Sequence, residues 1–248
     1  MASRTPTTLL RRTCTALPAR RALSTTARLG FDSPSADSSK PRWSYTPPAM
    51  KAPFSPHVTK DPRRSEWRVN EDPEVLDSMY TRLLGRDGAR MLPEEIKWLA
   101  VTHKSFDQAR RGMNDRLAYL GRMAIIHECA KSITSAAPKE PTDTPDEFGR
   151  VPFSNPLLDS LDNLTSEQPK HVVSVENLER VALEVGLLKA MRWKPRFPED
   201  LAASGQAVIL STTVAAIFGA IVLQHGSEVA SRLIRDRLLA RIKLMSSN

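Results

Sequence analysis

The sequence is poor in cysteine. Its 248 residues include only Cys14 and Cys129, too few for a secreted domain held together by disulfides or for a cysteine-rich zinc module. Runs of alternating apolar and polar residues are almost absent, which argues against β-strands, and there is no glycine-rich phosphate-binding loop. The hydrophobic share of 40% is somewhat low for a globular chain, so we expect a folded portion with a polar appendage.

Acidic residues are missing from the start of the chain. Residues 1–31 contain none, whereas arginine recurs there among serine, threonine, alanine and leucine. This composition is typical of a mitochondrial transit peptide, and the arginines interrupt every apolar run that a secretory signal would need. Because Arg21-Ala22-Leu23-Ser24 resembles a matrix-protease site, we expect residues 1–23 to be removed and the mature protein to lie in the mitochondrial matrix. A disordered basic tail is the alternative.

Large aliphatic residues are scarce over residues 24–65, which are rich in serine and proline. Such a segment cannot bury enough apolar surface to offset its ordering entropy, so we expect a disordered or extended basic tail. The net charge of +8 arises in the N-terminal part, because residues 1–64 hold 12 of the 36 Lys and Arg but only 3 of the 28 Asp and Glu. The overall charge is therefore weak evidence about the rest of the chain.

Helical periodicity dominates residues 66–248, so we predict an all-α domain. Residues that favour helix starts precede four of the periodic segments: Asp72, Pro93, Asn114 and Ser174. We expect helices over residues 72–86, 93–106, 115–133, 175–191, 206–224 and 228–245. Residues 137–173 form an insertion or loop region, since their first half is rich in proline and acidic side chains. The third helix is expected to turn four residues towards the core: Leu117, Leu120, Ala124 and Ile125.

Charged residues are absent between Leu201 and Gly226, a stretch longer than the roughly 20 residues that span a bilayer. An inner-membrane protein anchored by residues 201–226 is therefore one interpretation. The first half of the stretch, however, contains serine, threonine and glutamine, and its apolar part, residues 214–223, makes only about two or three helical turns. We predict a buried core helix and no integral membrane anchor.

Two segments resemble the signature motifs of the ribonuclease III family. The first comprises Leu99-Ala-Val-Thr-His-Lys-Ser-Phe106 and Asn114-Asp-Arg-Leu-Ala-Tyr-Leu-Gly-Arg122, and the second is the run from Ile209 to Leu223 followed by Gly226. Their order and separation are similar to those of the family's endonuclease domain, and the match covers residues 72–245. The resemblance implies a ribonuclease III-like helical bundle, here preceded by the extended N-terminal tail.

The resemblance also implies where the metal-binding carboxylates of the family belong, and none is present. Phosphodiester hydrolysis with Mg²⁺ needs hard oxygen ligands, yet the matching positions hold Ala118, Arg122, Thr212 and Ala215. A guanidinium at position 122 repels a divalent cation. An acidic residue, Asp115, remains at a flanking signature position. Its place at a helix N-terminus, where the helix dipole favours negative charge, is enough to explain it. We therefore expect no metal, no cofactor and no enzymatic activity.

Two histidines give no catalytic or metal site. His103 matches a signature residue, but no acidic partner is evident in the sequence, so a packing or capping role is favoured over a general base. His127 and Cys129 stand two residues apart on a predicted helix, where their side chains diverge and cannot share a metal ion.

The family resemblance further implies a protein partner and contact with RNA. Ribonuclease III domains pair through the signature helix, where an aromatic side chain enters the partner, and Tyr119 stands at that position. A second copy or a homologous protein is therefore expected to pair here, with Tyr119 in its own core as the alternative. Basic residues around the signature helix and on the last helix are expected to hold RNA phosphates, with a solvated helix face as the alternative: Arg110, Arg111, Arg116, Arg122, Arg232, Arg235, Arg241 and Lys243.

The mitochondrial address, the inactivated fold and the basic tail together resemble the ribonuclease-III-like proteins of the fungal mitochondrial ribosome's large subunit. This resemblance implies a structural component of the large subunit that packs on rRNA and on neighbouring ribosomal proteins. A working mitochondrial endonuclease that processes double-stranded RNA is the alternative from another class.

Overall fold

The computed structural model describes residues 67–137, 145, 147–151, 153, 155 and 158–246. The predicted transit peptide, residues 1–23, and the predicted tail, residues 24–65, lie outside the described residues. The described part is helical, contains no β-strand, and has a single isolated bridge, which pairs Thr102 with Arg192 in parallel. The predicted all-α class is confirmed.

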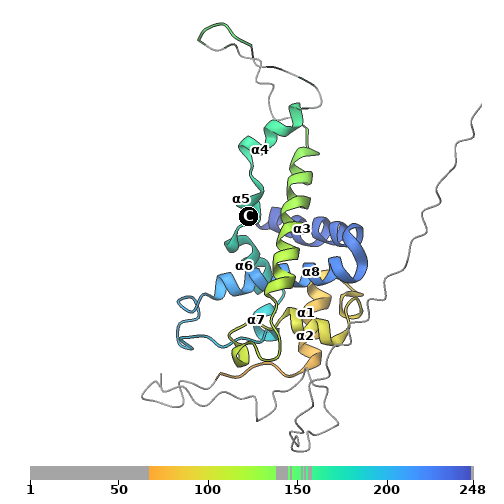
Figure 1. Cartoon of the computed structure of the whole chain (residues 1–248), viewed down its shortest axis with the longest axis vertical. Helices are drawn as coiled ribbons and strands as arrows, with labels where there is room; N and C mark the ends of the chain where they lie inside the picture. Colours follow the sequence, from red (N-terminus) through yellow and green to blue (C-terminus); the bar gives the residue numbers. More distant parts are fainter. Residues whose placement is uncertain are drawn as a thin grey trace, which may run out of the picture. The chain divides into compact units, whose positions relative to one another are not determined.

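The arrangement centres on two long helices that cross. Figure 1 shows α3 crossing α8, with α4 and α5 beside the C-terminal part of α3. A π-helical segment, Ile234–Leu239, joins α8 to α9. The helices in chain order are α1 Pro73–Leu84, α2 Glu94–Ala100, α3 Asp115–Thr134, α4 Asn163–Ser166, α5 Pro169–Val172, α6 Val175–Glu184, α7 Leu187–Ala190, α8 Gln206–Leu233 and α9 Ala240–Ser246.

Local residue preferences set several of the helix ends. The Asp72 carboxylate accepts the N–H of Glu74 at 2.9 Å, and the Ser174 hydroxyl accepts the N–H of Asn177 at 3.3 Å. Each bond satisfies a backbone donor that helix geometry leaves without a partner, so these two predicted caps are confirmed. The predicted break after residue 224 is also present, because Gly226 has φ 84° and ψ 170°, a conformation that glycine alone adopts readily.

Two predicted helices are too long. The helix predicted over residues 93–106 ends at Ala100, because the following backbone pairs elsewhere: the N–H of His103 donates to the carbonyl of Arg192, and the N–H of Arg192 donates to the carbonyl of Val101, both at 2.9 Å. The helix predicted over residues 175–191 is interrupted at Gly186, whose φ of 79° is left-handed, and α7 follows as a separate turn.

The buried face of α3 differs from the predicted one. Ile125 is buried as expected, whereas three of the residues predicted to face the core are only half-buried: Leu117, Leu120 and Ala124. Ala118 and Gly121 are buried instead, since they face α8. The prediction followed the large side chains, but the closest packing uses the small ones.

The uncharged stretch lies in the core. The helical run Gln206–Ser246 is long and apolar enough to cross a membrane, with a mean hydropathy of 2.1 over its most apolar 18 residues, but 61% of that window is buried inside the protein. Its fully buried side chains include Leu210, Ile217 and Phe218. Each contributes roughly 2 kcal/mol to stability through burial, which favours the predicted core helix over a membrane anchor.

Candidate functional site

The α3–α8 crossing brings two backbones into direct contact. A Cβ atom added to Gly121 would lie 1.8 Å from the carbonyl oxygen of Ala215, and one added to Gly219 would lie 2.0 Å from that of Leu117. No side chain fits at either glycine, so the two helices meet at a distance that only glycine permits. The crossing thereby fixes the positions of the residues that stand where the family resemblance implies carboxylates.

Beside the crossing lies a cleft of about 380 Å³. Three of the four substituted positions line it, namely Ala118, Arg122 and Thr212, so the structure brings these three together. Ala215 is buried in the helix crossing instead. The remaining lining residues are His103, Lys104, Asp115, Tyr119, Val208 and Ile209.

The cleft does not fit a divalent metal ion. Its lining offers one carboxylate, that of Asp115, and this lies 3.7 Å from the ammonium of Lys104. The Thr212 hydroxyl donates to the carbonyl of Val208 at 2.7 Å, which ties it to its own helix. The Arg122 guanidinium adds a second positive charge. No group of three His, Cys, Asp or Glu side chains suited to a metal ion occurs among the described residues. The donor set is therefore suited to an anion rather than to Mg²⁺.

Asn114 occupies the N-cap position of α3, as predicted, but its side chain makes no capping hydrogen bond. Its side-chain amide donates to the carbonyl of Ala100 at 3.0 Å and to the hydroxyl of Thr213 at 3.4 Å, and it is fully buried. The residue therefore links the end of α2 to α8 beneath the cleft. Because both partners lie far from it in the sequence, local capping rules could not find this role.

His103 lines the cleft, and its ring accepts a hydrogen bond through Nδ1. Its Nδ1 accepts the backbone N–H of Ser105 at 3.2 Å and lies 2.9 Å from the Ser105 hydroxyl, so the hydrogen bonds assign the ring proton to Nε2. Burial, and then the charge of Lys104, lower the pKa of His103 below its ordinary value, while Asp115 opposes them. The bonds to Ser105 favour the predicted packing role.

The predicted RNA-binding cations fall into different settings. Arg116, Arg122, Arg232 and Lys243 are exposed. Arg111 is mostly buried, with its guanidinium 5.1 Å from the Phe106 ring centre and its Nε 3.6 Å from the Asp107 carboxylate. Arg241 bonds the carbonyl of Arg82 and lies 3.6 Å from the carboxylate of Glu184. Arg110 is half-buried. The predicted set is therefore not one continuous surface.

Arg235, whose side chain is 52% exposed, forms an ion pair with a buried carboxylate. Its guanidinium contacts one carboxylate oxygen of Glu128 through two nitrogens, at 2.6 and 3.1 Å, and the Glu128 side chain is 1% exposed. Burial by itself raises the pKa of Glu128, but the hydrogen bonds from Arg235 and Ser231 outweigh it, and the pKa lies below its ordinary value. The pair therefore stabilises the fold above the unfolded-state pKa of Glu128 and less as the pH falls through the lowered value. Sequence reasoning missed it, because the partners stand 107 residues apart.

Tyr119 does not lie in its own core. Its side chain is 71% exposed, and Met123 and Ile126 are exposed one and two turns further along α3. These three residues, which we call the α3 apolar stripe, share one face of the helix by their spacing. The interpretation that places Tyr119 in the core is therefore wrong, and its role at a partner interface stays a prediction.

Similarity to known proteins covers most of the helical region. A family model described as ribonuclease-III-like matches residues 93–242. The chain is 50% identical over 205 residues to a Neurospora crassa protein named large ribosomal subunit protein mL57, which covers 82% of this chain and 76% of that protein. The crystal structure of the nuclease domain of ribonuclease III from Campylobacter jejuni is also similar, with 22% identity and a TM-score of 0.47, over 68% of this chain and 93% of that domain.

Proposed function

The chain belongs to the ribonuclease-III-like family, and from this membership we propose that it is a structural, non-catalytic component of the mitochondrial large ribosomal subunit. The observation that carries the proposal is the 50% identity to a large ribosomal subunit protein over most of both chains. The cleft supports it independently, because its lining holds one acidic residue where hydrolysis needs several.

The proposed location is the mitochondrial matrix. It is supported by the arginine-rich, acid-free composition of residues 1–31, which suits import along the matrix-negative potential. No integral membrane anchor is proposed, because most of the apolar window of α8 is occupied in packing against the protein's own core.

The proposed contact with rRNA uses the exposed cations around the cleft. Arg122 stands where a carboxylate would hold a metal, and its planar fork of donors matches a phosphate group. Arg116 is exposed on the same helix. Binding through phosphates needs no chemistry and no base-specific contact, which is consistent with an architectural role beside rRNA.

Co-sedimentation tests the proposed function. In a sucrose gradient of mitochondrial lysate at low salt, we expect the tagged full-length chain to migrate with the large subunit, and to leave it when EDTA or high salt dissociates the ribosome, since phosphate contacts weaken as salt rises. Free migration at the size of a monomer or dimer in low salt would contradict the proposal.

The proposed protein partner is a second ribonuclease-III-like ribosomal protein or another copy of this chain, packed on the α3 apolar stripe. An exposed tyrosine flanked by exposed Met123 and Ile126 suits a helix–helix interface. Both forms of the pairing, homodimer and heterodimer, use the same face.

Site-specific crosslinking tests this pairing. A photoreactive amino acid in place of Tyr119 is expected to give a crosslink, in assembled large subunits, to this chain itself or to a second protein of its family. The same group in place of Leu244, an exposed residue of α9, serves as control and should not give that product. Crosslinks from position 119 to RNA alone, or to an unrelated protein, would contradict the proposed pairing.

A further inference from the structure

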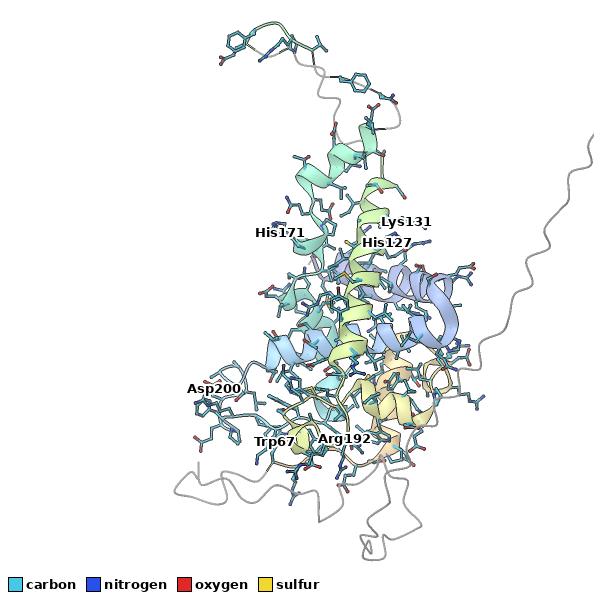
Figure 2. All side chains as sticks on the ribbon, in the orientation of Figure 1. Trp67, His127, Lys131, His171, Arg192 and Asp200 are labelled. Atoms are coloured by element: carbon cyan, nitrogen blue, oxygen red, sulfur yellow. The ribbon has the colours of Figure 1, made fainter. Side chains whose placement is uncertain are left out.

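Two largely buried segments run side by side at one end of the domain, and Lys104 and Lys194 are their exposed residues. Residues 101–105 and 191–194 are joined by the backbone bonds between Val101, Arg192 and His103, and the N–H of Lys194 donates to the Ser105 hydroxyl at 3.0 Å. The buried Arg192 side chain fixes the pairing from below, with its guanidinium 3.5 Å from the ring centre of Trp98. Figure 2 shows Arg192 below the lower end of α3, whereas His127 and Lys131 lie on the upper part of that helix.

The loop that follows presents an exposed aromatic ring on a constrained backbone. Phe197 is 49% exposed, and Ser204 holds its backbone from both sides, since the Phe197 N–H donates to the Ser204 hydroxyl at 2.8 Å and that hydroxyl lies 3.0 Å from the Phe197 carbonyl. Prolines at positions 195 and 198 restrict the neighbouring backbone further. The backbone that carries the ring is therefore constrained before any ligand arrives, which lowers the entropy cost of binding.

One cation lies against this ring, since the Arg196 guanidinium is 5.3 Å from the ring centre of Phe197. Lys104, Lys194 and Arg196 are exposed on the two paired segments and the loop, and we call these three residues with Phe197 the paired-loop surface. Lys104 lies 3.7 Å from Asp115, but both side chains are largely in solvent, so the pair has little stabilising effect. Lys104 also lines the cleft that contains Arg122, so the paired-loop surface is continuous with that cleft.

We propose that the paired-loop surface binds an unpaired segment of RNA, with a base stacked on Phe197 and the flanking phosphates held by Lys104, Lys194 and Arg196. The proposal rests on the proposed contact with rRNA and adds a site for a splayed-out nucleotide. An exposed aromatic ring among lysine and arginine is the combination that single-stranded RNA requires, because every base has a stacking face and every linkage a negative charge. A protein neighbour would explain the exposed ring but not the three exposed cations on the same segments.

RNA binding by the full-length chain tests the proposal. The probes are a fluorescent RNA stem–loop and a blunt RNA duplex without unpaired residues, titrated over a series of salt concentrations. We expect Phe197→Ala and Phe197→Leu to weaken binding of the stem–loop by about tenfold and to leave the duplex unchanged, whereas Phe197→Trp keeps the wild-type affinity. Lys194→Ala and Arg196→Ala should weaken both RNAs and each lower the salt slope by about one.

Two matched variants serve as controls. Phe153→Ala removes a more exposed phenylalanine from a different loop, and Arg232→Ala removes an exposed arginine that pairs with Glu228 on α8. Phe153→Ala should leave binding of both RNAs unchanged, and Arg232→Ala should leave the preference for the stem–loop unchanged. The proposal is overturned if Phe197→Ala binds each RNA with the wild-type affinity. If that variant also no longer migrates with the large subunit, the ring is assigned to a protein contact. If the wild type fails to co-sediment while Phe197→Ala loses the stem–loop, the proposed function fails and the site stands.

Discussion

Replacing Gly121 by alanine is expected to destabilise the protein by about 3 kcal/mol or more, because the new methyl group would lie 1.8 Å from the carbonyl oxygen of Ala215. The obstruction is backbone rather than a side chain that could rotate away, so α3 and α8 must separate. Separation would also open the packing of Ala118 and Phe218 in the core. Urea unfolding, followed by circular dichroism, measures the change in the free energy of unfolding.

A glycine in open space provides the control. A Cβ atom added to Gly149 meets nothing within 4 Å, and its φ of 73° imposes only the usual left-handed strain of about 1 kcal/mol on alanine. Gly219→Ala should behave like Gly121→Ala, since its methyl group would meet the carbonyl of Leu117 at 2.0 Å. If Gly121→Ala proves as stable as Gly149→Ala, the two helices do not cross at the glycine pair.

Local sequence rules predicted the helices and several of their ends, but not how the helices pack. Asp72 and Ser174 were identified as caps, and the break at Gly226 was placed correctly, because each depends on residues within one turn. The early end of α2 depends instead on Arg192, about ninety residues away, whose backbone takes over the hydrogen bonds of residues 101–103. The buried face of α3 depends on α8, which no pattern within α3 reveals.

The candidate site shows the same division. The family resemblance matched Ala118, Arg122 and Thr212 to positions of one site, and the structure places all three in the lining of one cleft. The resemblance could not show that Arg235 is tied to a buried Glu128. Nor did the sequence single out Lys194 and Phe197, whose surroundings form only when residues 101–105 and 191–194 pair.

Loss of catalysis is the second large effect that we expect. Members of a metal-dependent nuclease family hydrolyse RNA because carboxylates hold Mg²⁺, which activates water and stabilises the leaving oxygen. Here a methyl group, a guanidinium and a hydroxyl bonded to its own helix line the cleft, and the one remaining carboxylate, that of Asp115, lies beside Lys104. Without the ligands the rate should fall by many orders of magnitude, to the uncatalysed background.

Incubation of the purified full-length chain with double-stranded RNA, in Mg²⁺ or Mn²⁺ and in parallel with EDTA, tests the loss of metal chemistry most directly. We expect identical RNA in all samples, with no fragment that depends on the metal. The account would be contradicted by cleavage that EDTA abolishes and that disappears in the variant Asp115→Asn while the fold is kept. The protein would then be a metal-dependent nuclease.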